Sequence, residues 1–531
     1  MQYQGVILTN TRTLALKYRE PAAKVISLLD EIIRQERKAS RDWLLLDVCS
    51  NPRDARGVPT WEYYNERISD FFRQHSIPTG ISTSLLIIGG DDVIPMPSLP
   101  SPFYVEGYTA EQIPTDFAYC FDARYITSVM NDHIPPVSEE AVRNHVARLP
   151  LESGVLFSSI KEDLESFFIR CNQYPSESGL PVDGVTVTTD REWVHATDAI
   201  AEGLPLICDG HADNFVYHGM YTSPDLLIHS SQELLNPFLS SIQRSDMLIF
   251  NLHGSDRPGH AGFFSHRGVV VDTDMVQASH ARVVNTLACF GARFMTYSRK
   301  DSMLLSSIYS GRKLLYLGAS VPVPMSVSAL SRQHSGFGVY RGSGAEKLFQ
   351  YYNFYLFQGV PAGEALMRAK IDYFHRPCPD EAPSFRFTTL MIMSLFGNPL
   401  LRFQPRPDVM DKIGQQLLRE QSEQENALDS EEKTQTKSFV SDRPLEDAHS
   451  LLSEIQRRVD ANLEEFHRTV QRELKQKFGI EAMIVTEVKP KAWAQDAGAN
   501  AFLCKSPSVW GEIFFAMAEK DGTVNHIITF K

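Results

Sequence analysis

Two segments of the sequence place reactive side chains directly after runs of apolar residues. His253 and Gly254 follow the run MLIFNL, and Cys289 follows the run RVVNTLA. In open parallel sheets, functional groups collect in the crevice beyond the carboxyl ends of the strands. We therefore expect the two side chains to face each other from adjacent strands. An imidazole beside a thiol favours the thiolate and later protonates a leaving amine, so the pair predicts cysteine-based nucleophilic catalysis.

A cysteine nucleophile that attacks a carbonyl also needs hydrogen-bond donors for the oxyanion. Gly254 offers a backbone N–H that no side chain shields, and the N–H of Cys289 is the second candidate donor. A single histidine after a strand is usually structural, and a single buried cysteine is usually inert. The combination of the two strand ends is what favours chemistry here.

The bulk composition is that of a folded, acidic protein. A chain of 531 residues is longer than one hydrophobic core usually serves, so several domains are expected. Its 52 Lys+Arg against 65 Asp+Glu give a formal net charge of −13. This charge argues against nucleic acid as a partner. The N-terminus does not resemble a secretory signal, and no apolar run is long enough to cross a membrane. We therefore expect a cytoplasmic protein without a membrane partner.

The cysteines indicate neither a disulfide framework nor a metal site. There are seven, widely spread and without a CxxC pair: Cys49, Cys120, Cys171, Cys208, Cys289, Cys378 and Cys504. His260 and His266 follow the candidate catalytic histidine, but no carboxylate or thiol stands at ligand spacing, so we interpret them as loop residues. We expect no metal and no other cofactor. The cysteine pattern also predicts a reducing compartment.

Residues up to 405 alternate between apolar runs and amphipathic segments, which predicts an α/β fold with a mostly parallel sheet flanked by helices. We expect two subdomains, residues 1–200 and a catalytic subdomain of residues 201–405. The expected strands are Trp43–Val48, Ser84–Ile88, Gly184–Thr188, Met247–Leu252, Arg282–Leu287 and Lys313–Leu317. The expected helices include Ala22–Arg37, Glu62–His75, Lys161–Cys171, Ser302–Ser310 and Gly344–Phe357.

The composition changes after residue 405. Residues 406–442 are rich in Glu, Gln, Ser and Lys, which predicts a polar linker. Residues 443–531 are expected to form a separate accessory module. A long helix, Pro444–Phe478, would be followed by a small α/β unit with the strands MIVTEV and HIITF and a short helix near Val509–Ala518.

Several segments, in order, resemble gingipain-type peptidases of the caspase-like clan. Besides NLHGS and TLACFG, they are LLIIGGDDVIP (Leu85–Pro95), IPTDFAYCFD (Ile113–Asp122), VARLPLES (Val146–Ser153) and SLFGNPLLRF (Ser394–Phe403). The resemblance covers about residues 80–405. It implies a caspase-like fold, a Cys289/His253 dyad, an oxyanion role for Gly254 and endopeptidase activity. Ala147 and Asn398 depart from the family pattern at positions that look structural. We take over nothing about export or calcium.

The specificity pocket is less well determined by the sequence. If the pocket is acidic, Asp209, Asp213 and Asp116 are the candidates, and cleavage would follow Arg or Lys. The loop Gly318–Gly338, rich in Ser, Pro and Gly, is suited to a pocket wall or an activation segment.

The leading hypothesis is a cytoplasmic cysteine endopeptidase that cleaves a specific protein partner. Its C-terminal module would bind a regulatory protein or sense a signal, and by family analogy its context would be bacterial defence or programmed cell death. The alternative is a catalytically inactive caspase-like scaffold that acts as a protein-binding module. A zymogen cut in the linker, near Arg419, Lys433 or Lys437, is a third hypothesis.

Overall fold

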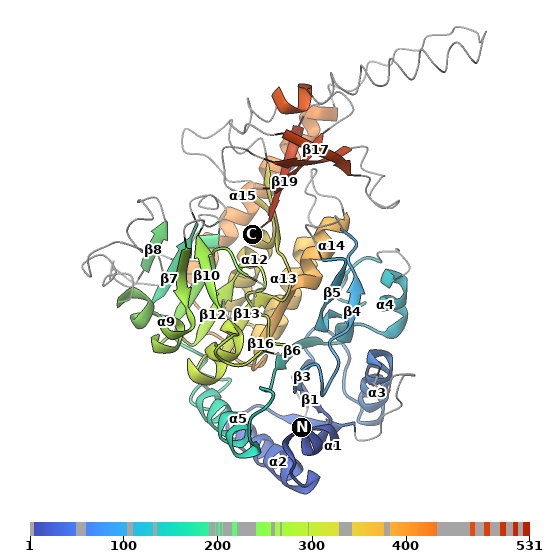
Figure 1. Cartoon of the computed structure of the whole chain (residues 1–531), viewed down its shortest axis with the longest axis vertical. Coiled ribbons are helices and arrows are strands. Elements are labelled where there is room, and N and C mark those ends of the chain that lie inside the picture. Colours follow the sequence, from blue (N-terminus) through green and yellow to red (C-terminus); the bar gives the residue numbers. More distant parts are fainter. Residues whose placement is uncertain are drawn as a thin grey trace, which may run out of the picture.

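The computed structural model describes most of the first 432 residues and the strands of the C-terminal region. The described residues are 5–48, 60–103, 110–130, 135–190, 197, 200, 201, 204, 206, 215–219, 240–255, 261–265, 268–295, 297–328, 342–375, 383–432, 468–472, 483–488, 500–505, 513–518 and 524–530. Figure 1 shows one large body with the C-terminal strands gathered at one end.

The body is built around a ten-stranded sheet with the order β2-β1-β3-β6-β16-β13-β12-β9-β7-β8. Neighbouring strands of this sheet pair parallel except β13 and β16, which pair antiparallel. The strands are β1 (Gly5–Thr9), β2 (Trp43–Asp47), β3 (Ser84–Ile88), β6 (His145–Leu149), β7 (Val185–Thr189), β8 (Phe215–Gly219), β9 (Met247–Asn251), β12 (Val283–Thr286), β13 (Leu315–Ala319) and β16 (Met393–Gly397). The predicted mostly parallel sheet is confirmed.

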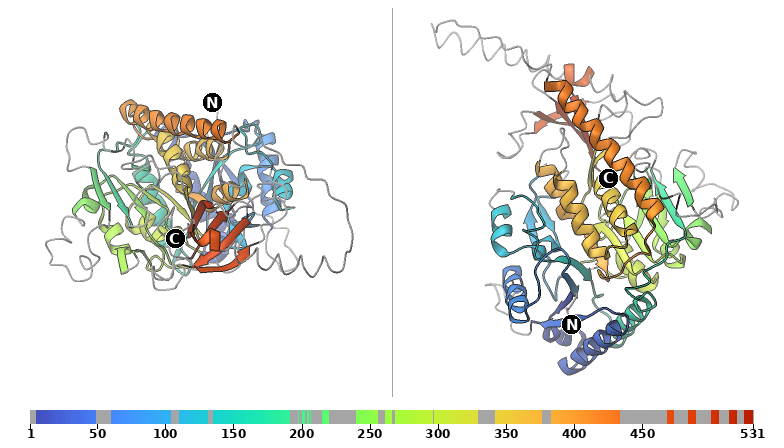
Figure 2. Two further views of the ribbon diagram at one scale, coloured as in Figure 1. Left: turned by 90° about the horizontal axis from the view of Figure 1, so that it is seen from above. Right: turned by 180° about the vertical axis from the view of Figure 1, so that it is seen from behind.

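Helices flank this sheet, as predicted. They are α1 (Thr11–Tyr18), α2 (Ala22–Lys38), α3 (Trp61–Gln74), α4 (Ala123–Met130), α5 (Phe157–Cys171), α9 (Thr273–Ala278), α10 (Met303–Leu305), α12 (Ala345–Phe357), α13 (Ala362–His375), α14 (Pro383–Ile392) and α15 (Pro407–Glu432). A π-helical turn, η4 (Ser306–Ser310), continues α10. Figure 2 shows α12, α13 and α15 together on one face of the sheet.

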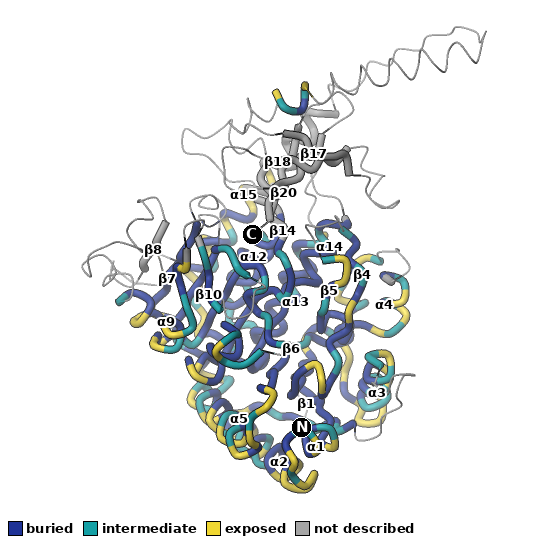
Figure 3. The backbone as a smooth tube through the Cα atoms, in the orientation of Figure 1, coloured by how far each residue is buried: buried dark blue, intermediate teal, exposed yellow. Residues whose placement is uncertain are grey.

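The apolar runs form strands because both faces of the sheet are covered. β3, β9, β12 and β13 are buried along their whole length, and Figure 3 shows the burial concentrated in the middle of the body. A strand buried on both faces needs an unbroken apolar sequence. This is why all six strands expected from such runs are present, one with the expected bounds (Ser84–Ile88) and the others within two residues of them.

The sheet runs through both subdomains expected from the sequence. Four strands of residues 1–200 (β2, β1, β3 and β6) form one end of its order, but the fifth, β7, lies between β9 and β8 of residues 201–405. The division into two subdomains stays a prediction.

The first part of the predicted polar linker is a helix, which corrects the expectation for residues 407–432. α15 places Val409, Ile413 and Leu417 one turn apart, and all three are buried. This apolar stripe packs on α12. Most residues of the helix lie on its exposed side and are polar, and only a few apolar residues form the stripe that packs. The overall composition therefore resembles that of a linker.

The C-terminal region is a sheet in its described parts, and the helix predicted near Val509–Ala518 is wrong. Residues 513–518 form β19, which pairs antiparallel with β18 (Asn500–Lys505) and β20 (Val524–Phe530). The run IFFAMA is rich in large apolar residues, which favour strands that can pair on both sides. Of the long helix predicted from Pro444 to Phe478, residues 468–472 are described, and they are helical.

This sheet is not separate from residues 201–405. Its strand order is β15-β14-β20-β19-β18-β17, in which β14 (Pro324–Ser328) and β15 (Gly342–Gly344) come from the loop after β13. β17 (Met483–Val488) is the opposite edge strand. β14 pairs with β20 along five residues, from Pro324 opposite Phe530 to Ser328 opposite His526. Backbone pairing therefore joins the C-terminal region to the segment that follows β13.

Candidate active site

His253 stands just beyond the carboxyl end of β9. The backbone of His253 exchanges two hydrogen bonds of 2.8 Å with that of Phe264 in strand β10 (Gly262–Ser265). β10 forms an antiparallel hairpin with β11 (Gly268–Asp272). The neighbouring Phe263 is fully buried and packs against Phe250 of β9, with ring centroids 5.1 Å apart. The hairpin thus fixes the backbone of the histidine while its side chain stays partly exposed.

Cys289 occupies the matching position beyond β12. β9 and β12 are adjacent and parallel, and their register pairs Phe250 with Thr286. His253 and Cys289 each lie three residues beyond this last pair. Both residues therefore stand at the same height beyond the carboxyl ends of the two strands. The prediction that adjacent parallel strands carry the two residues is confirmed. The catalytic role of the pair stays a prediction.

The chain turns sharply directly after the cysteine. Phe290 has a φ of 55°, in the left-handed region that non-glycine residues rarely adopt. The N–H of Gly291 closes the turn on the carbonyl of Ala288 at 3.1 Å, and the Tyr316 hydroxyl donates to the carbonyl of Gly291. Strained backbone of this kind clusters at active sites, where it fixes the direction of a side chain.

The backbone of Gly254 lies directly against that of Cys289. A Cβ atom at residue 254 would overlap the carbonyl oxygen of Cys289 and would lie 3.2 Å from its backbone nitrogen. Only glycine allows this approach. The two proposed oxyanion donors, the N–H groups of Gly254 and Cys289, thus belong to two loops in direct contact. This is the arrangement that the sequence predicts from a glycine after the histidine.

The segment after β13 covers the sulfur of Cys289. The N–H of Val323 donates to the Sγ of Cys289 at 3.2 Å, and the N–H of Phe290 donates to the carbonyl of Val321 at 3.3 Å. Cys289 is only 1% exposed and Val323 is fully buried. A substrate carbonyl therefore reaches the sulfur only after a local movement.

A small recess of about 20 Å³ opens beside Cys289. Beyond the cysteine turn it is lined by Ser255, Arg293, Tyr297 and Asp301. The guanidinium of Arg293 lies over the ring of Tyr297, 4.8 Å from its centroid. Sequence reasoning missed these three later residues. Their position within twelve residues of Cys289 was the available signal, but only the turn at Phe290 brings them back to the site.

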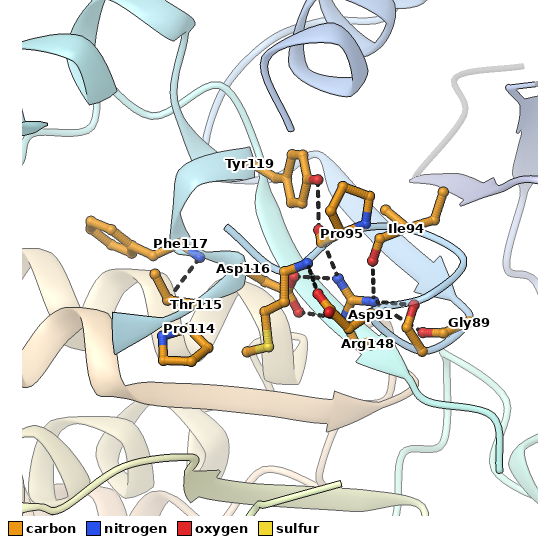
Figure 4. Close-up of polar contacts among 12 residues, drawn as sticks. Gly89, Asp91, Ile94, Pro95, Pro114, Thr115, Asp116, Phe117, Tyr119 and Arg148 are labelled. Atoms are coloured by element: carbon orange, nitrogen blue, oxygen red, sulfur yellow. Dashed lines mark hydrogen bonds and ion pairs between the residues drawn. The ribbon is translucent and has the colours of Figure 1, made fainter. Parts of the chain in front are cut away.

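Asp116, a candidate for the substrate pocket, is part of a buried ion pair. Both of its carboxylate oxygens accept hydrogen bonds from Arg148, at 2.8 Å and 2.6 Å. The same guanidinium donates to the carbonyls of Gly89 and Ile94, at 3.0 Å and 2.9 Å (Figure 4). One arginine thus joins three of the segments that carry the family resemblance, those around residues 89, 116 and 148. The geometry explains Asp116 as a structural residue.

Replacing Asp116 by asparagine is expected to lower the free energy of unfolding by about 3 kcal/mol, because Arg148 would keep a buried charge without its counterion. Urea unfolding measures this. Glu165→Gln is the control, since it removes only the exposed Lys161–Glu165 pair and should cost under about 1 kcal/mol. The structural role also predicts an unchanged preference for the residue before the scissile bond. A changed preference with unchanged stability would restore Asp116 as a pocket residue.

The fourth segment of the family resemblance is also held by a buried charge. The side-chain amide of Asn398 donates to Glu36 at 2.8 Å, and Glu36 is paired with the buried Arg41. The preceding Gly397 has a φ of 110°, and a Cβ atom there would overlap the carbonyl oxygen of Leu314. The turn that ends β16 is therefore a structural junction, consistent with the expectation for Asn398.

The remaining residues that the sequence analysis considered for the pocket or for a metal cannot be placed. Asp209, Asp213, His260 and His266 lie outside the described residues. Within the described ranges no group of three His, Cys, Asp or Glu side chains is arranged to hold a metal ion. Across the same ranges, every helix is too short or too polar to cross a membrane.

Comparisons with known proteins give fold-level similarities only. No protein-family model matches the chain, and no curated protein matches it, so the gingipain-type resemblance gains no support. Similar solved structures include one titled "Structure of Protease", which is 10% identical over 76% of this chain and 79% of that chain, with a TM-score of 0.45. They also include two Saccharomyces cerevisiae separase-securin complexes.

In these complexes the identities are 12% and 11%, over 48% and 66% of this chain, with TM-scores of 0.28 and 0.31. This chain matches 14% and 18% of the separase-securin chains. Because all the TM-scores are below 0.5, we take no residue role from these structures.

Proposed function

We propose that this chain is a cysteine endopeptidase with a caspase-like fold, in which Cys289 is the nucleophile and His253 the general base and acid. One observation carries the proposal. Two adjacent parallel strands in register place both residues at one edge of the sheet, with the backbone of Gly254 packed on that of Cys289. This combines a nucleophile, a proton carrier and two oxyanion donors at one point.

The chemistry follows from these groups. His253 takes the proton of the Cys289 thiol, and the thiolate attacks the carbonyl carbon of the scissile peptide. The N–H groups of Gly254 and Cys289 stabilise the oxyanion of the tetrahedral intermediate. His253 then protonates the leaving amine, the thioester remains on Cys289, and a water molecule activated by His253 hydrolyses it.

The recess beside Cys289 is the proposed binding site for substrate side chains. It holds both a cation, Arg293, and an acid, Asp301, whose carboxylate accepts a hydrogen bond from Ser298 at 2.7 Å. We propose a protein substrate and leave the residue before the cut to experiment. None of the described cysteines Cys120, Cys171 and Cys289 is in a disulfide, in line with the proposed cytoplasmic location. A context in bacterial defence or programmed cell death follows from the family resemblance alone.

The C-terminal sheet is the proposed regulatory element, and it holds the site closed. Val323, which covers the sulfur of Cys289, is followed immediately by β14, and β14 is paired with β20. Five residues of ladder therefore anchor the covering segment to the end of the chain. A regulatory protein that opens this pairing would expose Cys289.

A proline in β20 tests this regulatory proposal. Ile527 stands opposite Val327 of β14, and β20 lies inside the sheet, where proline disrupts pairing. Ile527→Pro is expected to raise the rate of Cys289 alkylation by iodoacetamide at least about fivefold. Val485→Pro is the control, because Val485 lies at the bulge of the edge strand β17. An Ile527→Pro protein that remains folded and is alkylated no faster than wild type would contradict the closed state.

The endopeptidase proposal itself is tested with a peptide library. The wild-type protein and Ile527→Pro are incubated with the library, and cleaved bonds are identified by mass spectrometry. Cleavage is expected, and a peptidyl chloromethyl ketone based on the best sequence should label Cys289 and stop it. No cleavage by either folded protein would overturn the proposal.

The alternative, an inactive scaffold, has one observation in its favour, the burial of Cys289. Labelling with the peptidyl chloromethyl ketone separates the two functions. If the protein is an inactive scaffold, the ketone leaves Cys289 unlabelled in Ile527→Pro as well, although the segment that covers the cysteine has been released.

A further inference from the structure

A second recess lies beyond the amino ends of the central strands, whereas Cys289 lies beyond their carboxyl ends. It is formed at the amino ends of β12 and β13, where α5 and η4 meet these strands, and it has a volume of about 470 Å³. Its lining residues are Arg170, Gln173, Tyr174, Gln277, Ala278, Ser279, His280, Arg282, Ser310, Gly311, Arg312 and Leu314. We propose that this recess binds a small phosphate-bearing anion.

The charge of the recess is the first argument. Arg170, Arg282 and Arg312 line it together with His280, and none of the lining residues named above is acidic. One counterion is close: Asp246 accepts from Arg282 at 3.0 Å, and its second oxygen is engaged by the backbone N–H of Asp183 at 2.9 Å. The nearest other acidic group is Asp163, which acts on Arg170 but is paired with Arg299. Arginine is the side chain best suited to bidentate contact with phosphate.

Behind the recess, burial and neighbouring cations disfavour the charged forms of Lys313 and Arg170. Lys313 is fully buried, and its Nζ donates to the carbonyl and the hydroxyl of Ser279, at 2.8 Å and 2.6 Å. Burial lowers the pKa of Lys313 to about 7, and the charges of Arg282 and Arg170 act in the same direction. Burial also lowers the pKa of Arg170, with a further contribution from Arg312. Cations that disfavour one another in this way are stabilised by a bound anion.

The backbone holds the cationic side chains in place. Arg312 has a φ of 58°, a strained left-handed conformation for an arginine, and it projects from the tight turn between η4 and β13. The N–H of Leu314 donates to the carbonyl of Arg282 at 2.8 Å, so the starts of the two strands are tied together. The guanidinium of Arg282 also lies over the ring of Tyr174, 5.3 Å from its centroid.

The expected ligand is a small molecule rather than a polymer. The recess is a bounded hollow, and the net charge of −13 opposes a long polyanion. The site stands at the far ends of β12 and β13 from Cys289, so it is distinct from the proposed active site and does not rest on it.

Pyrophosphate is the probe that tests this site, titrated into the full-length protein by calorimetry at constant ionic strength. We expect saturable binding with one site per chain. Arg312→Asn removes one charge and keeps a residue that tolerates positive φ, so it should weaken binding at least about tenfold. Arg124→Gln, an exposed substitution on α4 far from the recess, should leave binding unchanged.

Three outcomes would overturn the proposal. They are the absence of saturable binding by the wild-type protein, an equal loss of affinity in Arg124→Gln, and tighter binding of citrate than of pyrophosphate, which would indicate a carboxylate site. A thermal melt of each variant ensures that lost binding is not lost folding. Arg170→Met provides an independent second variant, with the same weakening expected.

Discussion

Replacing Cys289 by alanine is expected to lower kcat/KM for the best library peptide by about 10⁴-fold or more. Without the thiolate no thioester forms, and removal of a nucleophile from a peptidase site has effects of this size or larger. Residual activity would come only from binding and the oxyanion donors. Cleavage is followed by the appearance of product in the Ile527→Pro background, where the site is expected to be open.

Two other buried cysteines provide matched controls. Cys120 and Cys171, like Cys289, are buried and form no disulfide. Burial raises the pKa of Cys120 to about 12 and that of Cys171 well above its usual range, so neither thiol ionises readily near neutrality. Cys120→Ala and Cys171→Ala should keep kcat/KM within about threefold for the folded fraction. A Cys289→Ala protein as active as these controls would remove the proposed nucleophile.

Gly254→Ala is expected to lower kcat at least about 100-fold with little change in KM. A Cβ atom at this position would overlap the carbonyl oxygen of Cys289, so one of the two loops must move. Any such movement displaces an oxyanion donor, and loss of one donor costs about 10² to 10³ in kcat. Steady-state kinetics on the same peptide, with a circular dichroism spectrum of each variant, measures the effect.

Gly414→Ala is the matched control for this substitution. Gly414 lies in α15, where alanine favours the helix, and a Cβ atom would come within 3.3 Å only of the Phe354 ring. This variant should keep wild-type kcat and KM. Wild-type kcat in Gly254→Ala would show that the contact between the two loops has no part in catalysis.

The sequence predicted the sheet and the pairing of the two strands because both signals are local. β9 and β12 are unbroken apolar runs, and the reactive residue follows each run at the same distance. Once the strands are adjacent and parallel, the equal number of residues after each run places His253 and Cys289 at the same height beyond the sheet. The sequence could not show that Cys289 is covered, because the covering residue, Val323, comes from another strand end.

The C-terminal sheet could not be predicted because its partners are far apart in the sequence. β14 and β20 are separated by about 200 residues, and neither shows in its composition that it pairs with the other. The recess beside Cys289 was missed for a similar reason, since Arg293 and Tyr297 return to it only through the left-handed turn at Phe290. The motif around Asp116 was recognised, but its buried partner Arg148 is visible only in three dimensions.

The rate at which iodoacetamide alkylates Cys289 at pH 7, measured in the open Ile527→Pro background with and without His253→Ala by mass spectrometry of the Cys289 peptide, tests the central claim most directly. If the imidazole takes the thiol proton, adding His253→Ala lowers the rate at least about tenfold, while adding the exposed-site control His75→Ala leaves it unchanged. Equal rates with and without His253→Ala in this background would contradict the account, because the two side chains would then not share a proton.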